Sequence, residues 1–467
     1  MKRKLLLLTL ALVAMALFAA CGGNDDTPAP PAGGDAPPAE GGAETPPAPP
    51  VEVPDGVQVI NLWAFTDEIP RMVVEFKRLN PEFAERYHVV STIIPTDGGG
   101  YQLALDMALA GGGADAPDMF AAESAMVVRY SQGDMSSFAM SFEELGITDL
   151  SGKIAAADIA QYTVDLGSRD GDVVALAFQH TGSALIYRRS LAIQTWGTDD
   201  PDYIRTRVGP GWGRFMDAAA ELDAEGISIV SGSGDIWQAV RNTGGPWIVN
   251  GQLDIHPDRM AFFDYARTLY QNGWFNDTAS WSGAWFADMS GSGDRPVFSF
   301  LGPAWLINYV MADNAGDTYG DWAITVPPVG FSWGGTWVFP AANMQEGARD
   351  GVRQLIEWIT LDTSNTGLQY MWANGTLFAD NDTKDAVSSG VVMAGADGSI
   401  PFLGGQDMFD ILIPAGAYAD GTLFTQHDEI INGWFNDHGM YYARGDMTRD
   451  EALDAFRLLV RENIGIE

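Results

Sequence analysis

The sequence is poor in cysteine, histidine and basic residues, and each shortage excludes a class of function. Its 467 residues include one cysteine, Cys21, and five histidines. A single thiol cannot close an internal disulfide or assemble a multi-thiolate metal site, and no histidine stands in a zinc-protease motif. Lys and Arg number 26 against 62 Asp and Glu, for a formal net charge of −36. This acid excess repels nucleic acid. We expect no nucleic-acid partner, no metal and no cofactor.

The common catalytic motifs are also missing. There is no G-x-S-x-G nucleophile elbow, and the glycines that begin at Gly111 lack the lysine of a phosphate-binding loop. The acidic stretch from Asp380 has Lys384 and Asp385 where a calcium loop needs other residues, which favours a solvated loop. We therefore predict that the protein is not an enzyme. Its many carboxylates would suit a glycoside hydrolase, so a secreted carbohydrate-active enzyme is the alternative.

The apolar run at the N-terminus is too short to span a membrane and is typical of a targeting segment. A basic start precedes a mainly apolar stretch over residues 5–18 and two alanines, whereas a membrane-spanning helix needs about 20 apolar residues. The next residues resemble the lipobox of bacterial lipoproteins, with Phe18 where leucine is usual. We predict a signal peptide over 1–20 and lipidation of Cys21, for example with palmitate. An ordinary secretory signal is the alternative.

The residues that follow have the composition of a tether. Residues 24–56 contain no aromatic or basic residue and are rich in Pro, Ala and Gly. Such a segment cannot bury a core, so we predict a disordered tether over 21–56 that includes the lipidated cysteine. The body, 57–467, is long enough to divide into two lobes. These segments predict a protein anchored by lipid to the cell membrane, on its extracellular or periplasmic side.

The body begins with alternating strand and helix patterns. Strand-like runs at 57–65, 87–95 and 117–123 are separated by helical periodicity over 69–79 and 101–111. This order predicts an α/β fold with a mostly parallel sheet, and ligands bind at the carboxyl ends of such strands. The 15 Trp and 54 Gly favour a binding cleft lined by flat rings.

An ordered set of sequence pieces resembles the solute-binding proteins of ABC importers, of the carbohydrate-binding type that includes maltose-binding protein. The pieces follow family order over nearly the whole body: INLWAF, LALDMALAGGGADAPDMFAAE, VVALAFQHTGSALIYRRSL, FLGPAWLIN, DWAITVPPVG and YARGDMTRDEALDAF. The resemblance implies two α/β lobes, each a mostly parallel sheet flanked by helices, with the ligand cleft between them. It places lobe 1 at about 57–174 and 327–361, and lobe 2 at about 175–326 and 362–467.

The resemblance also implies which residues line the cleft. Trp305 follows a strand in GPAW, and an indole stacks on the apolar C–H face of a sugar ring. The alternative is a helix start that packs inward. Glu123 stands where the family carries a ligand-contacting acid, and a carboxylate accepts two hydroxyl donors; ordinary surface charge is the alternative. Phe65 and Asp67 follow the first strand, although Asp67 would equally suit a helix cap.

Four further residues complete the predicted site. His180 lies beside the first crossing between lobes, where contacts with the backbone would explain it equally well. Trp337 follows two glycines that let the backbone approach a ligand. Trp237 and Trp285 are candidates that would also suit the core.

These expectations combine into one predicted function. By resemblance, the protein is a membrane-anchored receptor that delivers a sugar, oligosaccharide or polyol to ABC importer permease subunits. Solute would bind the open lobes and stabilise the closed form. We expect a monomer that needs no cofactor.

Overall fold

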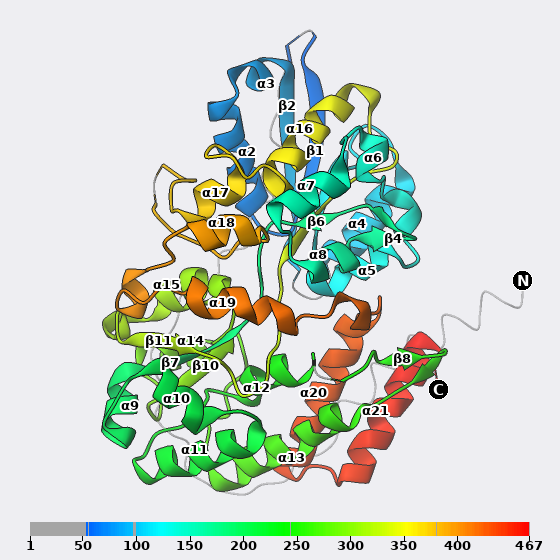
Figure 1. Cartoon of the computed structure of the whole chain (residues 1–467). Coiled ribbons are helices and arrows are strands. Elements are labelled where there is room, and N and C mark those ends of the chain that lie inside the picture. The colour runs from blue at the N-terminus through cyan, green and yellow to red at the C-terminus, as the bar shows by residue number, and fades with distance from the viewer. Residues whose placement is uncertain (1–52, 55, 97–99, 243, 380, 467) are drawn as a thin grey trace, which may run out of the picture. The chain divides into compact units, whose positions relative to one another are not determined.

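The computed structural model describes residues 53–54, 56–96, 100–242, 244–379 and 381–466 (Figure 1). The predicted signal peptide, Cys21 and nearly all of the predicted tether lie outside these residues. Among the described residues, no helix is both long and apolar enough to cross a membrane. The body contains two main sheets, and the first and second lobes below are the parts built on the first and second sheet.

The first sheet has five strands in the order β2–β1–β3–β12–β6. The strands β1 (Gln58–Ala64), β2 (Tyr87–Ile93) and β3 (Met119–Glu123) are parallel. The fourth, β12 (Thr336–Pro340), runs antiparallel to both β3 and β6 (Leu176–Ala177). Four of the five strands therefore share one direction, which confirms the predicted α/β class.

Helices flank this sheet as the periodicity predicts. The first, α2 (Glu68–Leu79), buries Ile69, Met72, Val73 and Phe76 on one face and leaves its other face to solvent. A second helix, α4 (Gly100–Gly111), connects β2 to β3, and α16 (Arg349–Thr360) packs beside β12 (Figure 1). These connections return the chain to the same edge of the sheet, so the ends of β1 and β3 lie close together.

The second sheet departs from the predicted mostly parallel arrangement. Its three strands have the order β10–β7–β11, and β7 (Ala184–Arg188) is antiparallel to both β10 (Ser299–Gly302) and β11 (Trp322–Thr325). The strands β7 and β10 are far apart in sequence and are joined by several helices, so the sheet is not a succession of βαβ units. Strand-like patterns alone do not reveal this order of pairing.

Helices around the second sheet complete the second lobe. They include α11 (Trp212–Ala224) and α13 (Pro257–Asn272), which lie below the sheet in Figure 1, and α20 (Asp428–Arg444) and α21 (Arg449–Ile464), which lie to its right. The last of these begins with a capping box, in which the Thr448 side chain accepts from the Glu451 amide. The sequence predicts this helix start, and the structure confirms it.

The chain passes from the first sheet to the second between β6 and β7 and returns between β11 and β12. After α16 it stays beside the first sheet for some distance. Gln369 Nε2 donates to the Thr360 carbonyl (2.7 Å), and Ser388 Oγ donates to the carbonyl of Ala177 in β6 (2.7 Å). Only then does it reach α20 and α21 of the second lobe. The exact lobe boundaries stay a prediction.

Candidate functional site

Trp281, Trp305 and Trp333 form a cluster of indole rings, called here the aromatic cluster. The rings of Trp281 and Trp305 are parallel within 6°, with centroids 6.2 Å apart. Trp333 meets Trp305 edge-on at 4.8 Å. Trp281 is 54% exposed, and the other two are half-buried. Flat, partly exposed indole faces are suited to stacking on the C–H face of a sugar ring.

Trp305 is held in place by the chain on both sides of it. It follows β10 and immediately precedes η3 (Leu306–Met311), a π-helical turn of a kind common at functional sites. Its Nε1 donates to the carbonyl of Trp333 (3.0 Å). Gly334 has φ +74°, and a Cβ there would lie 3.1 Å from that same Nε1. The close approach therefore favours glycine at 334. The hydrogen bond to the Trp333 carbonyl satisfies the Trp305 indole N–H within the protein.

Trp281 adopts a backbone conformation that is unusual for its residue type. Its φ is +68°, in the left-handed region that costs a residue with a Cβ roughly 1–2 kcal/mol. Its ring contacts Trp285, whose centroid is 5.5 Å away. Trp285 is buried, and its Nε1 donates to Asp235 (3.0 Å). Strain of this kind persists only where the surroundings enforce it, and it is concentrated at functional sites.

Charged residues from both lobes approach each other near the aromatic cluster. Glu123, at the end of β3, accepts hydrogen bonds from Ser124 Oγ (2.6 Å) and the Ala125 amide (2.9 Å). Burial raises the pKa of Glu123, the nearby Glu429 raises it further, and Arg241 opposes both. Burial also lowers the pKa of the Arg241 guanidinium, against the attraction of Glu123. Arg241 follows α12 (Ser233–Val240) of the second lobe, so the two lobes contribute opposite charges here.

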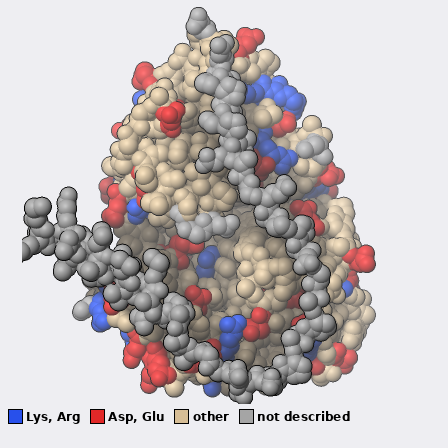
Figure 2. Space-filling model, turned by 180° about the vertical axis from the view of Figure 1, so that it is seen from behind, with Lys and Arg blue, Asp and Glu red and all other residues tan. Residues whose placement is uncertain are grey.

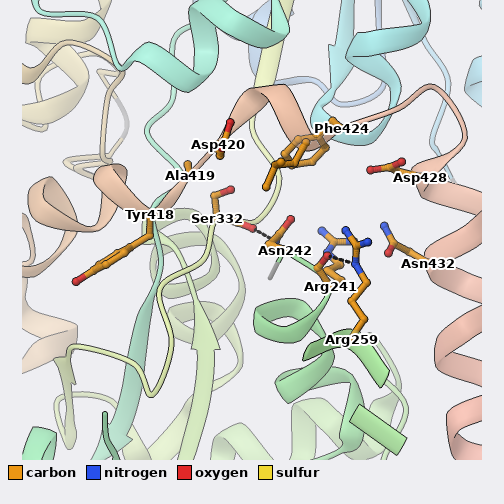
Figure 3. A pocket seen from close by; sticks show the side chains of 11 residues that line it. Arg241, Asn242, Arg259, Ser332, Tyr418, Ala419, Asp420, Phe424, Asp428 and Asn432 are labelled. Atoms are coloured by element: carbon orange, nitrogen blue, oxygen red, sulfur yellow. Dashed lines mark hydrogen bonds between the residues drawn. The ribbon is translucent and has the colours of Figure 1, made fainter. Parts of the chain in front are cut away.

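A small polar cavity lies beside this charged group (Figure 3). Arg241 and Arg259 line its floor, Asp428 and Asn432 of α20 line one wall, and Ser332 lines the opposite wall. Ser332 directly precedes Trp333. One short segment before β12 therefore carries part of the cavity and part of the aromatic cluster.

Among the predicted site residues, Trp305 lies in the aromatic cluster and Glu123 in the charged group. Phe65 is half-buried against Tyr101, with ring centroids 5.8 Å apart. Asp67 is exposed before α2, and its side chain makes no capping hydrogen bond to the described residues of that helix. His180 is buried, and its Nδ1 accepts from the Gly182 amide (3.3 Å). Burial lowers the pKa of His180 to about 4, so this ring is neutral at pH 7.

The other three predicted tryptophans lie in the core rather than at a ligand surface. Trp337 is 0% exposed, and its Nε1 donates to the Thr163 carbonyl (2.9 Å). Trp237 packs against Phe262 and Phe435, and Trp285 lies beneath Trp281. All five residues of β12 are buried, so both faces of the sheet are covered at this strand and Trp337 has no exposed side.

The acidic loop near Asp385 also differs from expectation. The composition predicts a solvated loop, but Asp385 is 1% exposed and its Oδ2 has no partner among the described residues. Residue 386 accepts from the His180 amide, which draws this loop against the crossing between lobes. Burial raises the pKa of Asp385 to about 8, and burial and Asp385 together raise that of Glu68 to about 8. Gln179 Nε2 contacts Glu68 Oε1 at 3.5 Å.

The wider surface is acidic. In Figure 2, Asp and Glu side chains are scattered over both halves of the visible face, and Lys and Arg form only small groups. Within the described ranges, no three His, Cys, Asp or Glu residues are placed to hold a metal ion.

Several members of the site are not identifiable from the sequence alone. Trp281 and Trp333 stand in tryptophan- and glycine-rich stretches, which are a usable signal. No sequence signal identifies the charged residues Arg241, Arg259 and Asp428. They come together from the ends of α12, α13 and α20 only when the chain folds.

Comparisons with known proteins place this geometry in context. Residues 81–394, more than half of the chain, match the family described as bacterial extracellular solute-binding protein. Comparison with curated proteins gives no match. Among solved structures, the galacto-N-biose-/lacto-N-biose I-binding protein of a Bifidobacterium longum ABC transporter, in complex with lacto-N-biose, has a TM-score of 0.64 at 14% identity. The match covers 89% of this chain and 100% of that one.

Two further structures share the fold. The ABC transporter associated binding protein from B. animalis subsp. lactis Bl-04, in complex with β-1,6-galactobiose, has a TM-score of 0.61 at 17% identity and covers 87% of this chain and 97% of its own. The sugar-binding protein MalE from Xanthomonas citri has a TM-score of 0.60 at 14% identity, with the same coverages of 87% and 97%. At these identities the similarity shows a common fold.

Proposed function

Because the chain belongs to the bacterial extracellular solute-binding protein family, we propose that it is the carbohydrate receptor of an ABC importer. The observation that carries this proposal is the aromatic cluster beside a group of charged side chains. Parallel indole faces bind the apolar face of a sugar, and carboxylate and guanidinium groups bind its hydroxyls. A site for a purely apolar or purely ionic solute would not need both.

The two lobes contribute different parts of this site. Glu123 comes from the end of β3 in the first lobe, whereas Trp305 and Arg241 come from the second. A solute that contacts all three bridges the lobes and stabilises the closed form, as in hinge closure around ligands. We propose that the closed form then docks on a membrane permease.

The solute is best matched by a disaccharide or short oligosaccharide. The aromatic cluster contains three rings rather than one, so it offers more stacking surface than a single sugar ring covers. Two neighbours with the same fold are complexes with lacto-N-biose and β-1,6-galactobiose. A monosaccharide or a polyol is the smaller alternative.

A thermal-shift screen of the purified protein tests the proposal. The panel contains lacto-N-biose, β-1,6-galactobiose, maltose and their monosaccharides. A sugar at a hundredfold excess over its Kd stabilises the folded state by about 2.7 kcal/mol. The sugar should be recovered unchanged after prolonged incubation. Hydrolysis that disappears in Glu123→Gln would instead support the glycoside hydrolase alternative.

We also propose that the protein is a lipoprotein attached to the membrane through Cys21. The proposal rests on the sequence, since Cys21 lies outside the described residues. Cys21→Ala should move the protein from the membrane fraction to the soluble fraction without changing its melting temperature. If the variant still sediments with membranes after a high-salt wash, the anchor lies elsewhere.

A further inference from the structure

The polar cavity below Phe424 has room for one oxygen atom. Its volume is about 20 Å³, enough for one water molecule or one hydroxyl group. It lies between α13 and α20 of the second lobe and the segment 418–424, which covers it from above in Figure 3. The residues at its mouth, Tyr418 and Asp420, are exposed. The cavity is therefore open on this side. Its lining residue Ser332 directly precedes Trp333, so we infer that a group projecting from a solute on the aromatic cluster can reach it.

Arg259 supplies buried donors to this cavity. The residue is 2% exposed, its Nε donates to the Arg241 carbonyl (3.0 Å), and its guanidinium lies 4.3 Å from the centroid of a Trp247 ring. Its Nη1 is buried and has no hydrogen-bond partner within the described part of the chain. Burial lowers the pKa of Arg259 to about 10, so it stays charged at pH 7. A buried guanidinium with an open N–H favours an acceptor nearby.

Asp428 supplies an acceptor on the adjacent wall. It is 5% exposed, and its Oδ1 accepts from the Thr425 amide (3.1 Å) and from the Thr425 hydroxyl. Burial raises its pKa to about 6, so it is mostly ionised at pH 7. Among the described residues, no hydrogen bond joins this carboxylate to Arg259 or Arg241. Asn432, whose Oδ1 accepts from Trp247 Nε1 (3.0 Å), completes the wall.

The two arginines do not make this an anion site, because acids already balance them. Asp428 attracts both guanidinium groups, and Arg241 is also attracted by Glu123 and Glu429. A carboxylate entering the cavity can only accept hydrogen bonds, so it would meet Asp428 as a like charge. A hydroxyl accepts from Arg259 and donates to Asp428 at the same time. The cavity therefore matches a neutral group that both donates and accepts.

We propose that this cavity is a subsite for the exocyclic hydroxymethyl group of a neutral sugar, and that it rejects the uronic acid in which that group is a carboxylate. The hydroxymethyl group is preferred over ring hydroxyls because its extra carbon carries the oxygen away from the ring, into a space too small for the ring. An N-acetyl group is also too large for this cavity. The proposal rests on the carbohydrate function proposed above and adds the class of sugar.

Calorimetry with matched sugars tests the subsite. Maltose and β-1,6-galactobiose are each compared with two analogues that are changed only at the hydroxymethyl group of the non-reducing sugar unit. In the uronic acid this group is a carboxylate, and in the 6-deoxy sugar it is a methyl group. The sugar that binds should lose at least tenfold in affinity as its uronic acid and about tenfold as its 6-deoxy form. In Asp428→Asn, the ratio between neutral sugar and uronic acid should fall about tenfold. Asp454→Asn is the matched control, because Asp454 is exposed on α21 and does not line the cavity, and it should leave that ratio unchanged.

Two results would overturn the subsite. One is a uronic acid that binds the unchanged protein as tightly as its neutral partner. The other is an Asp428→Asn variant that folds and binds the neutral sugar but keeps the original ratio. If none of these sugars binds, the result counts against the proposed carbohydrate function and does not test the cavity. A measurement without sugar then tests whether the cavity prefers a neutral group to an anion.

That measurement uses crystals of the sugar-free protein soaked in sodium bromide. The proposal expects an ordered water molecule within hydrogen-bond distance of Arg259 and Asp428, and no anomalous signal from bromide at that position. Bromide bound there in the unchanged protein would show that the cavity selects anions, and would overturn the proposal.

Discussion

The aromatic cluster and the polar cavity are joined by adjacent residues, Trp333 and Ser332, but they are built in opposite ways. In the cluster the rings are partly exposed, and the Trp305 N–H has its partner within the protein. In the cavity the groups are buried and charged, and Arg259 Nη1 has no hydrogen-bond partner among the residues that the structure describes. Without ligand, exposed apolar ring faces reduce the stability of the folded state only a little. A buried polar group without a partner reduces it by about 1–3 kcal/mol.

This difference separates affinity from selectivity. Stacking on indole faces is tolerant of the identity of the sugar, because every pyranose has a C–H face. Buried donors and acceptors discriminate strongly, because a solute that fails to match them leaves them unpaired. We therefore expect changes in the aromatic cluster to alter affinity for all sugars together, and changes in the cavity to alter the ranking of sugars.

Trp305→Ala provides the largest expected effect. Loss of one stacking ring costs on the order of 1–3 kcal/mol, by analogy with ring stacking on bases, which is roughly a fivefold to hundredfold loss of affinity. The ligand-free melting temperature should change little, because the ring is half-buried rather than in the core. Calorimetry and melting on the same preparation measure both quantities.

Trp196→Ala is the matched control for this experiment. Trp196 is also half-buried, but it lies on the second lobe against Phe298, with its Nε1 donating to Glu221 (2.6 Å). Its loss should lower the melting temperature and leave affinity unchanged. If Trp305→Ala instead behaves like Trp196→Ala, Trp305 is a packing residue and the comparison between cluster and cavity fails.

Asp385→Asn tests how a buried carboxyl group outside the proposed ligand site affects the pH dependence of stability. Folding raises the pKa of Glu68 and Asp385 to about 8, from about 4 in an unfolded chain. The native state therefore holds more protons between these values, and this contribution to stability is lost as pH rises through 8. The unchanged protein should lose more stability from pH 6 to pH 9 than the variant, by a few °C in melting temperature as an order of magnitude.

Melting curves at pH 6 and pH 9 for both proteins check this expectation. His180 acts in the opposite direction and in a different window, because its pKa falls from 6.5 to about 4 on folding. It therefore removes stability as pH decreases from about 6.5 to 4, which lies mostly below pH 6 and affects both proteins alike. Equal losses in the two proteins between pH 6 and pH 9 would contradict a buried, proton-binding Asp385.

The smallest expected effect concerns the backbone at Trp281. Trp281→Gly and Trp281→Ala both remove the ring, so both should weaken sugar binding equally. They differ because glycine tolerates φ +68° and alanine does not. The glycine variant should be more stable by about 1 kcal/mol, measured by urea unfolding. Equal stabilities would mean that the left-handed conformation at 281 is not strained.

Much of the fold could be predicted because its signals are local. Hydrophobic periodicity locates α2 and α4, and the capping box locates the start of α21. Trp305 could be predicted because it stands in a short motif after a strand. In contrast, the antiparallel pairing around β7 depends on segments more than a hundred residues apart, which no local pattern records.

The predicted site was least accurate where burial depends on tertiary contacts. Trp337 follows two glycines and looks available to a ligand, but both faces of the sheet are covered at β12 and its side chain is buried. Asp385 stands in an acidic stretch that looks solvated, but the backbone of that loop pairs with the crossing segment. Arg259 and Asp428 could not be paired in advance, because they meet only through the packing of α13 on α20.

Because Trp281 is exposed, its intrinsic fluorescence should report the binding of a ligand. All 15 tryptophans lie among the described residues, and Trp281 is the one that is more exposed than buried. Acrylamide or iodide in solution should therefore quench its fluorescence ahead of that of the others. A sugar that covers Trp281 would shield it from the quencher, without any dye or label. The same property would let a purified sample rank unknown sugars in a plate reader, and would suit the protein to use as a sensor.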